Sequence, residues 1–381
     1  MMQVQAQSGG AGLQSEIQNP KSKIRSLAAG LLAAAAALAA SFACADPLPP
    51  PFESLGKPVL KAGLMGVLVG PGPAEGSERI YVNFRQDGGK LFLVAIDPAT
   101  GAAEQFKSPV GTGAWGFIVG PDQRIYLGTH EGPDASDNGQ ILVFDPKRPE
   151  QQIQIVGRPS ATETYLWQFC IGPEGKLYGC TYPQAKLVSY DPKTNAMEDL
   201  GRMDDEMMYS RSVAAGPDGK LYVAIGYGKA NVVVFDPKTR EHKAILPDAY
   251  RGDPAQTAAS VAKGVDGNVY VSATKMVPAG DGTKGPVAVT LKVGADGAMT
   301  EVAAPAMVTN TTLKDGRVVS NVTNNGAYDL TAPDGTVEHK TFKYAGDGAG
   351  LFYVANGPLG RVYGGTYMPL EMFWYDPATG A

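Results

Sequence analysis

Residues 211–239 read RSVAAGPDGKLYVAIGYGKANVVVFDPKT, and this phrase decides the fold because the chain repeats it. Residues 170–194 read CIGPEGKLYGCTYPQAKLVSYDPKT, and residues 355–379 carry a degenerate copy, ANGPLGRVYGGTYMPLEMFWYDPAT. Each copy alternates short runs rich in Val, Ile and Tyr with tight Gly/Pro/Asp turns, which is the pattern of antiparallel strands. A phrase that returns at a fixed period indicates a repeat architecture.

Two markers set the period of this repeat. An aliphatic residue followed by Tyr recurs at steps of roughly 44–52 residues, and an Asp-Pro pair follows it after a short run. The marker positions are Tyr81, Tyr126, Tyr178, Tyr222, Tyr270, a degenerate Val319 and Tyr363, and the Asp-Pro pairs begin at Asp97, Asp145, Asp191, Asp236 and Asp376. Both markers agree on seven units, and four short antiparallel strands per unit is the pattern of a β-propeller blade.

The seventh unit needs a strand from elsewhere, because the chain ends where its fourth strand would begin. Residues 52–57, FESLGK, are similar to residues 197–202, MEDLGR, the fourth strand of the third unit. We predict that residues near 52–58 complete the last blade, and the alternative is a fragment whose next strand is not included. The expected fold is all-β, a seven-bladed β-propeller of four-stranded antiparallel blades over residues 63–381, with the closing strand in residues 46–62.

Residues 1–45 are expected to be a signal peptide and leader. A positive patch at Lys21, Lys23 and Arg25 precedes the apolar run of residues 27–41, and Ala-Cys-Ala at residues 43–45 supplies a cleavage site. The run is too short for a comfortable membrane span, so the mature chain should have none. We expect an exported protein of the periplasm or extracellular space. Lipid anchoring through the cysteine at position 44 is less favoured, because the residues before it make a poor lipobox.

Composition excludes some partners. The formal net charge of −5 and the lack of a basic cluster in the body argue against nucleic acid, and a monomer is expected. Beyond the leader the chain has two cysteines, Cys170 and Cys180, which should lie diagonally on neighbouring strands of one hairpin. They could form one disulfide or remain two small buried thiols.

The GPDGKLY and FDPKT phrases resemble the broad propeller group with streptogramin-lyase, SMP-30/gluconolactonase and YVTN-type repeats. The resemblance covers most of residues 63–381. It implies a propeller fold, but these phrases are turn and strand chemistry and say little about activity.

Two sets of equivalent positions supply the predicted mouth of the propeller. The turns after the first and third strands are stereotyped, whereas the loops after the second strand vary, so we expect function on the variable side. The first ring lies four residues after each marker, at Arg85, His130, Tyr182, Gly226, Thr274, Thr323 and Tyr367, with Tyr227 and Lys275 one position later. The second ring lies five residues before the first turn's Gly, at Trp115, Trp167, Arg211, Ala259 and Phe352.

These residue types suit recognition of a sugar. Aromatic faces stack on flat apolar surfaces, and the arginine fork pairs with a carboxylate. We predict binding of a carbohydrate or similar small ligand at the central mouth and, as a finer hypothesis, a carbon–oxygen lyase acting on uronate polysaccharides. The expected catalytic residues are His130 and Tyr182, which would move a proton, and Arg211 and Arg85, which would neutralise a carboxylate. The expected ligand-binding residues are Trp115, Trp167, Tyr209, Tyr227, Lys275 and Tyr367.

Two other functions stay open. Tyr and Trp at strand ends also pack between blades, so the chain could be a non-catalytic cell-envelope scaffold that binds a protein partner, its mouth plugged by the long loop of residues 274–286. A metal-dependent lactonase-like hydrolase would need a ligand cluster at the mouth, to which Asn324 and Asn325 could contribute.

The sequence requires no cofactor. Ca²⁺ could bind the acidic loop of residues 129–140, which carries Glu131, Asp134 and Asp137, although a solvated loop is the simpler interpretation. In that loop His130 could instead bond to a neighbouring acid. The other two histidines, His242 and His339, fall on outermost strands and are expected at the surface.

Overall fold

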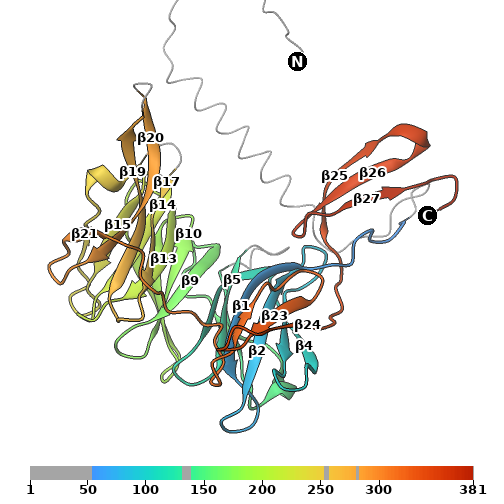
Figure 1. The fold of residues 1–381 in the computed structure, drawn as a ribbon, viewed down its shortest axis with the longest axis horizontal. Helices are drawn as coiled ribbons and strands as arrows, with labels where there is room; N and C mark the ends of the chain where they lie inside the picture. Colours follow the sequence, from blue (N-terminus) through green and yellow to red (C-terminus); the bar gives the residue numbers. More distant parts are fainter. Residues whose placement is uncertain (1–53, 131–138, 253–256, 280–282, 381) are drawn as a thin grey trace, which may run out of the picture. The chain divides into compact units, whose positions relative to one another are not determined.

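The computed structural model describes residues 54–130, 139–252, 257–279 and 283–380, all within the unit Ser54–Ala381 (Figure 1). These residues form antiparallel strands and three short 3-10 helices, η2 (Pro149–Gln151), η3 (Asp248–Tyr250) and η4 (Pro358–Gly360). In the described ranges, no helix has the length and apolar character needed to span a bilayer. The predicted all-β class is confirmed.

The first three units follow the predicted four-strand pattern. The first is β1 (Gly63–Pro71), β2 (Glu78–Arg85), β3 (Phe92–Ile96) and β4 (Ala103–Lys107); the second is β5 (Gly113–Val119), β6 (Ile125–His130), β7 (Ile141–Phe144) and β8 (Gln154–Gly157); the third is β9 (Tyr165–Ile171), β10 (Leu177–Tyr182), β11 (Lys186–Asp191) and β12 (Ala196–Arg202). A bridge between His130 and Tyr165 joins the second and third units into one sheet of eight strands.

The remaining units are less regular. The fourth is β13 (Tyr209–Ala215), β14 (Leu221–Gly228), β15 (Asn231–Phe235) and β16 (His242–Ala244), with β17 (Thr257–Ala258) added beside β14; the fifth is β18 (Ser260–Lys263), β19 (Val269–Pro278), β20 (Lys284–Val293) and β21 (Met299–Val302); the sixth is β22 (Val318–Ser320), β23 (Ala327–Thr331) and β24 (Val337–Thr341); the seventh is β25 (Gly350–Asn356), β26 (Val362–Tyr367) and β27 (Met372–Tyr375). Within the described residues the last two sheets therefore have three strands each.

A hydrogen bond within the second to fifth units explains why the turn phrase repeats there. The marker Tyr donates its hydroxyl to the acidic residue four positions earlier, as in Tyr222 to Asp218 (2.9 Å) and Tyr270 to Asp266 (2.7 Å). The Tyr ring lies over the first Gly of the turn, so that a Cβ on Gly216 would stand 2.7 Å from Tyr222 Cε2. Gly, Asp and Tyr are therefore one local device that fixes the first hairpin of the unit.

This device predicts the effect of a single methyl group. Gly216→Ala is expected to lower the free energy of unfolding by about 1–3 kcal/mol, because the added Cβ overpacks against the Tyr222 ring. Urea denaturation followed by circular dichroism measures the change. Gly285→Ala is the matched control, since no atom lies within 4 Å of its Cβ position, and its effect should stay within about 0.5 kcal/mol. Equal stabilities of the two variants would contradict the packing.

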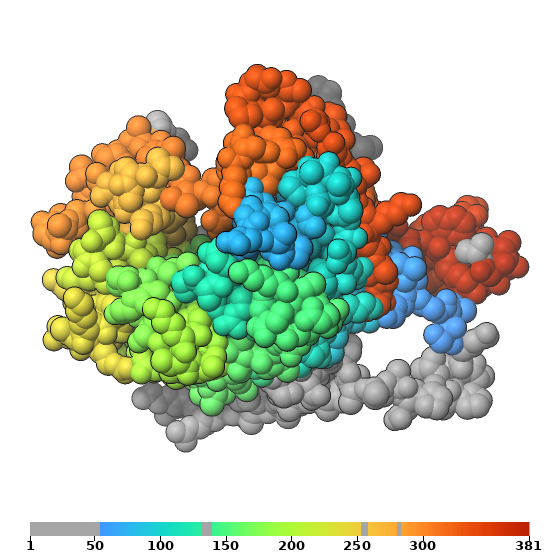
Figure 2. Space-filling view, turned by 90° about the horizontal axis from the view of Figure 1, so that it is seen from below, coloured from blue at the N-terminus to red at the C-terminus, as the bar shows by residue number. Residues whose placement is uncertain are grey.

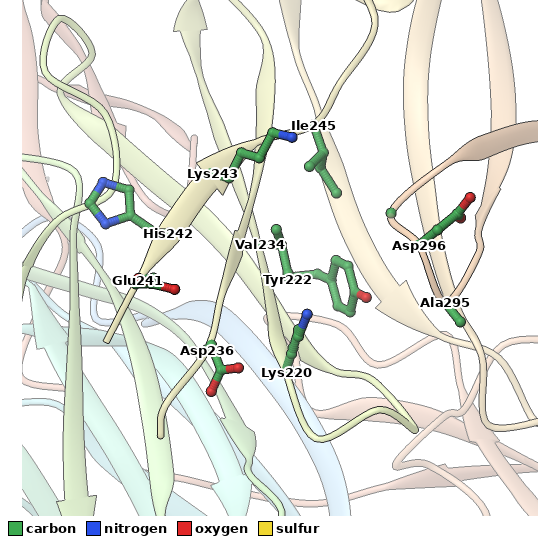
Figure 3. Close-up of a pocket in the computed structure, with 11 residues that line it drawn as sticks. Lys220, Tyr222, Val234, Asp236, Glu241, His242, Lys243, Ile245, Ala295 and Asp296 are labelled. Atoms are coloured by element: carbon green, nitrogen blue, oxygen red, sulfur yellow. The ribbon is translucent and has the colours of Figure 1, made fainter. Parts of the chain in front are cut away.

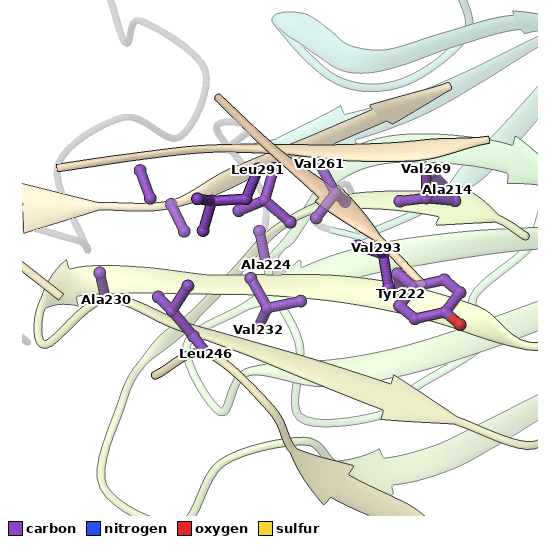
Figure 4. Close-up of a cluster of buried hydrophobic side chains, with 13 residues drawn as sticks. Ala214, Tyr222, Ala224, Ala230, Val232, Leu246, Val261, Val269, Leu291 and Val293 are labelled. Atoms are coloured by element: carbon purple, nitrogen blue, oxygen red, sulfur yellow. The ribbon is translucent and has the colours of Figure 1, made fainter. Parts of the chain in front are cut away.

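Successive units pack face to face. The innermost strands β1, β5, β9, β13 and β18 contact one another in sequence order, and Figure 2 shows the second and third units side by side in cyan and green. Between the fourth and fifth units, Tyr222, Ala224 and Val232 face Val261 and Leu291 (Figure 4). Burial of the inner faces between neighbouring sheets is how a propeller forms its core.

The sixth unit departs from the predicted ring, because it packs directly on the first. Phe84 of β2 is fully buried against Phe342 and Tyr344, which follow β24, and the Val69 amide donates to the Asn310 carbonyl. The sixth unit thus occupies the face of the first sheet that a seventh blade would cover in a closed ring.

The seventh sheet correspondingly leaves apolar side chains in solvent. Phe352 is 70% exposed, Leu370 is 79% exposed and Trp374 is 49% exposed. Among the described strands β27 pairs with β26 alone, and residues 54–62 contain no strand. The closing strand that we predicted near residues 52–58 is not found at 54–58, where Lys57 instead donates to the carbonyls of Gly88 and Asp347. Residues 52 and 53 lie outside the described part.

Candidate functional site

The second ring of predicted positions coincides with a β-bulge in the innermost strand of several units. The register shifts between Leu64 and Gly66 in β1, Ala114 and Gly116 in β5, Ser210 and Ser212 in β13, and Leu351 and Tyr353 in β25. In β9 the pairing with β10 shifts between Phe169 and Leu166. The residues inside these shifts include Trp115, Trp167, Arg211 and Phe352. A β-bulge changes the direction of a side chain relative to the alternating pattern of the strand, and bulges are frequent beside functional sites.

The first ring lies at one end of the second strands. Arg85, His130, Tyr182 and Tyr367 are the last residues of β2, β6, β10 and β26. Tyr227 is the last residue but one of β14. Four of the seven first-ring positions therefore share this strand-end placement, whereas Gly226 and Thr274 lie within β14 and β19 and Thr323 lies in no strand.

Trp167 is the centre of a connected group of rings. Its ring centroid lies 5.0 Å from that of Trp115, 5.7 Å from Tyr165 and 5.7 Å from Tyr209. Tyr182 stands 4.4 Å from Tyr209 and 4.8 Å from Tyr165. We call the aromatic strip the six residues Trp115, Tyr165, Trp167, Tyr182, Tyr209 and Tyr227. It runs over the second, third and fourth units, so it does not depend on how the ring closes.

The two predicted arginines have different surroundings. The guanidinium carbon of Arg211 lies over the rings of Trp167 (5.2 Å) and Tyr227 (5.8 Å), and Arg211 forms no ion pair with any described residue. Arg85 is nearly buried, with its Nε 2.7 Å from Asp87 Oδ1 and its guanidinium 5.4 Å from the Tyr367 ring. Of these two arginines, Arg211 is the one without an acidic partner in the described part of the chain.

His130 is buried at the end of the strip. It is 1% exposed, and its ring lies 5.4 Å from Trp115 and 5.6 Å from Tyr165. Its Nε2 has no hydrogen-bond partner among the described residues. Burial, reinforced by the positive charge of Arg85, lowers the pKa of His130 to about 3. The imidazole is therefore neutral at neutral pH, and the acidic loop proposed to bond it or to hold Ca²⁺ (Glu131, Asp134, Asp137) lies outside the described residues.

Sequence reasoning missed two residues of this region. Tyr165 touches His130, Trp167 and Tyr182, and its position two residues before Trp167 on one strand was the signal that could have found it. Glu163 is 1% exposed and accepts hydrogen bonds from Thr181 Oγ1 (2.6 Å) and the Gln184 amide (3.1 Å). It braces the turn that carries Tyr182, and no sequence signal separates such a buried acid from a surface one.

Some predicted residues lie apart from the strip. Lys275 pairs with Glu301 at 2.7 Å and lies over the Tyr250 ring. Tyr367 contacts Arg85 and Phe352. The segment 274–286, expected as a long loop that could plug the mouth, is instead the outer part of the β19–β20 hairpin, apart from residues 280–282, which are not described.

The other polar candidates have structural partners. Asn324 accepts a hydrogen bond from the Leu64 amide at 2.7 Å, which occupies one of the two amides considered for a metal cluster. Across the described ranges, His, Cys, Asp and Glu form no group of three able to hold a metal ion. His242 is exposed on β16, and His339 is exposed and pairs with Asp329. Both histidines lie at the surface, as predicted.

The two cysteines are free thiols. Cys170 lies opposite Tyr178, two residues before Cys180, so the predicted diagonal placement is confirmed. Burial raises the pKa of Cys170 to about 12 and also raises that of Cys180. Neither thiol is therefore a nucleophile at neutral pH.

A groove of about 600 Å³ lies away from the strip, between the outer parts of the fourth and fifth units (Figure 3). Lys220, Asp236, Glu241, Lys243 and Asp296 line it together with Tyr222. It belongs to the side of the stereotyped turns, and the Tyr222 hydroxyl is already used by Asp218. Charges of both signs in an open groove give it no directed recognition, so the strip is the better site.

Comparison with known proteins gives low-identity similarities to solved structures. No family model matches the chain, and no curated protein matches it. Among solved structures it is similar to a streptogramin B lyase at 11% identity, with a TM-score of 0.45 and coverage of 84% of this chain and 97% of that one. It is similar to a candidate gluconolactonase at 15% identity, with a TM-score of 0.34 and coverage of 68% of this chain and 87% of that one. It is also similar to the extracellular domain of a hybrid two-component system from B. thetaiotaomicron at 14% identity, with a TM-score of 0.38 and coverage of 83% of this chain and 38% of that one.

Proposed function

We propose that this chain is an exported protein that binds a carbohydrate, or a similar small ring-shaped ligand, on the aromatic strip. The observation that carries the proposal is the unbroken contact from Trp115 through Trp167 and Tyr209 to Tyr227, with Arg211 lying on two of these rings. Apolar ring faces beside a few directed polar groups are the usual composition of a small-ligand site.

Packing alone does not account for these side chains. Tyr227 is 72% exposed, although an aromatic ring that serves the core should be covered. Trp167 has a buried Nε1 donor without a partner among the described residues, and such donors normally find one. The exposed Tyr227 ring and the unsatisfied Trp167 donor are therefore two features of the strip that core packing does not require.

Lyase chemistry on uronate sugars is the finer hypothesis for the same residues. Arg211 would neutralise the carboxylate of the sugar, while His130 and Tyr182 would take and return the proton. With its pKa at about 3, His130 is a weak base in the ligand-free chain. Burial is the larger cause of this lowering, so His130 would need a less buried or more acidic environment in the ligand complex to act as a base.

Titration of the full chain with oligogalacturonates, followed by tryptophan fluorescence, tests binding, and near-ultraviolet absorbance of unsaturated products tests lyase activity. Trp167→Ala is expected to weaken binding at least about tenfold, because it removes the central stacking surface. Trp374→Ala is the matched control, since this tryptophan stacks on Arg361 in the seventh sheet. Equal affinities of the two variants would contradict the assignment of the strip. If activity appears and survives in His130→Ala, the proton-transfer role of that residue is wrong.

The scaffold alternative draws on one observation, the exposed apolar side chains of the seventh sheet, such as Phe352 and Leu370. A closed seven-bladed ring would instead cover these side chains between the first and sixth units, which pack directly on each other here. The lactonase alternative has no such support, because Asn324 is already bonded to the backbone.

A further inference from the structure

We infer that Arg211 is the subsite that reads the carboxylate of an acidic sugar, and that Arg85 is not. The inference rests on the proposed function and deepens it, because it names the group that would make the strip select charged over neutral ligands. It starts from the repeated bulge, which presents Trp115 in the second unit, Trp167 in the third and Arg211 in the fourth. The repeat therefore offers two stacking surfaces and then a cation at equivalent positions.

The surroundings of Arg211 suit an incoming carboxylate. The guanidinium lies over Trp167 and Tyr227, and no described acid pairs with it. Aromatic faces leave the in-plane N–H groups of a guanidinium available, and this planar fork matches both oxygens of a carboxylate. Arg211 is half-buried, so the attraction is screened less than at an open surface.

Arg85 is already occupied. Its Nε donates to Asp87 Oδ1 at 2.7 Å, and the residue is 7% exposed. A ligand carboxylate would have to compete with that aspartate for a buried cation. The sequence predicted the same role for both arginines. They differ in whether an acidic side chain of the described residues already binds the guanidinium, and anion recognition needs one that is not so bound.

Tyr227 supplies an independent indication. Its φ of +75° lies in the left-handed region, which a non-glycine residue adopts at a cost. β17 pairs with Gly226 and Gly228 on either side of it, so the ladder skips Tyr227 and leaves its ring 72% exposed above Arg211. A strained backbone that holds an exposed ring over a cation is the kind of outlier from which a functional role can be inferred.

Calorimetric titration of the full chain with trigalacturonate and with its fully methyl-esterified form tests the inference. The wild type is expected to bind the acid more tightly than the ester. Arg211→Gln should weaken acid binding about 10- to 100-fold, as expected for loss of a charged hydrogen-bonded pair, and should change ester binding less than about twofold. Arg240→Gln, at the exposed pair with Glu198, is the matched control and should change neither affinity.

A second variant separates recognition from folding. Tyr227→Gly should relieve the left-handed strain, so its melting temperature should equal or exceed that of the wild type while acid binding weakens. Equal losses for acid and ester in Arg211→Gln, or no loss, would overturn the carboxylate subsite while leaving the strip as a binding surface. Wild-type protein that binds neither compound would overturn the proposed function together with this subsite.

Discussion

Acidification from pH 6.5 to pH 4.5 is expected to destabilise the folded chain by about 1.4 kcal/mol per pH unit through His130 alone. The pKa of this buried imidazole is lowered from its ordinary value to about 3 by burial and by Arg85. Between these two pKa values, His130 is protonated in the unfolded chain but not in the folded chain. The free energy of unfolding therefore has its full value above pH 6.5 and falls as the pH drops. Urea denaturation at a series of pH values measures this slope.

Two variants show whether the slope belongs to His130. His130→Gln should flatten the curve between pH 6.5 and 4.5, whereas His242→Gln, on an exposed strand, should keep the wild-type slope. Carboxylates titrate below this pH range. Burial alone would raise the pKa of Asp199, but hydrogen bonds from Lys186 and Ser160 hold that pKa below its ordinary value. Its contribution is therefore lost only under more acidic conditions. An unchanged slope in His130→Gln would show that the imidazole is not buried.

Phe84→Ala is expected to lower the free energy of unfolding by about 3–5 kcal/mol. The side chain is fully buried, stacks on Phe92 at 5.1 Å and lies 4.6 Å from the Tyr344 ring, so its loss leaves a cavity between the first and sixth units. Phe84→Leu should cost less than about 1.5 kcal/mol. A double-mutant cycle with Tyr344→Leu should give a coupling of about 0.5–1.5 kcal/mol.

The same measurement on Phe352 distinguishes two arrangements of the last units. With Phe352 at 70% exposure, Phe352→Ala should change stability by less than about 0.5 kcal/mol. A cost of several kcal/mol for Phe352→Ala, together with no coupling between Phe84 and Tyr344, would instead favour a closed ring in which the seventh sheet covers the first.

The sequence repeat correctly predicted the features that depend on interactions within one hairpin. The Gly–Asp–Tyr device, as in Gly216, Asp218 and Tyr222, acts within one hairpin, so its recurrence located the strands and the ends at which Arg85, His130 and Tyr182 lie. Choice of neighbour between sheets is not local. Nothing in the period indicates that Phe84 meets Tyr344, because that contact depends on which buried faces fit together over a long separation in sequence.

Prediction of the site was limited in the same way. The period placed Trp115, Trp167 and Arg211 at equivalent positions, and adjacent inner strands then brought them together. The period also predicted Lys275 as a ligand-binding residue. However, β19 continues to Pro278, and Lys275 lies within this strand and pairs with Glu301. The sequence also did not show that Arg85 pairs with Asp87 whereas Arg211 pairs with no described acid, because the loops after the second strands differ in length and residue type from copy to copy.

The bulge in the inner strands has a consequence for how this molecule could change over generations. The first to fourth and the seventh units each project one displaced side chain from such a bulge, so exchanging that residue leaves the hydrogen-bond ladders of the neighbouring units unchanged. Substitution of a single bulge residue could therefore change ligand preference in one unit at a time, while the repeated strands and turns stay the same.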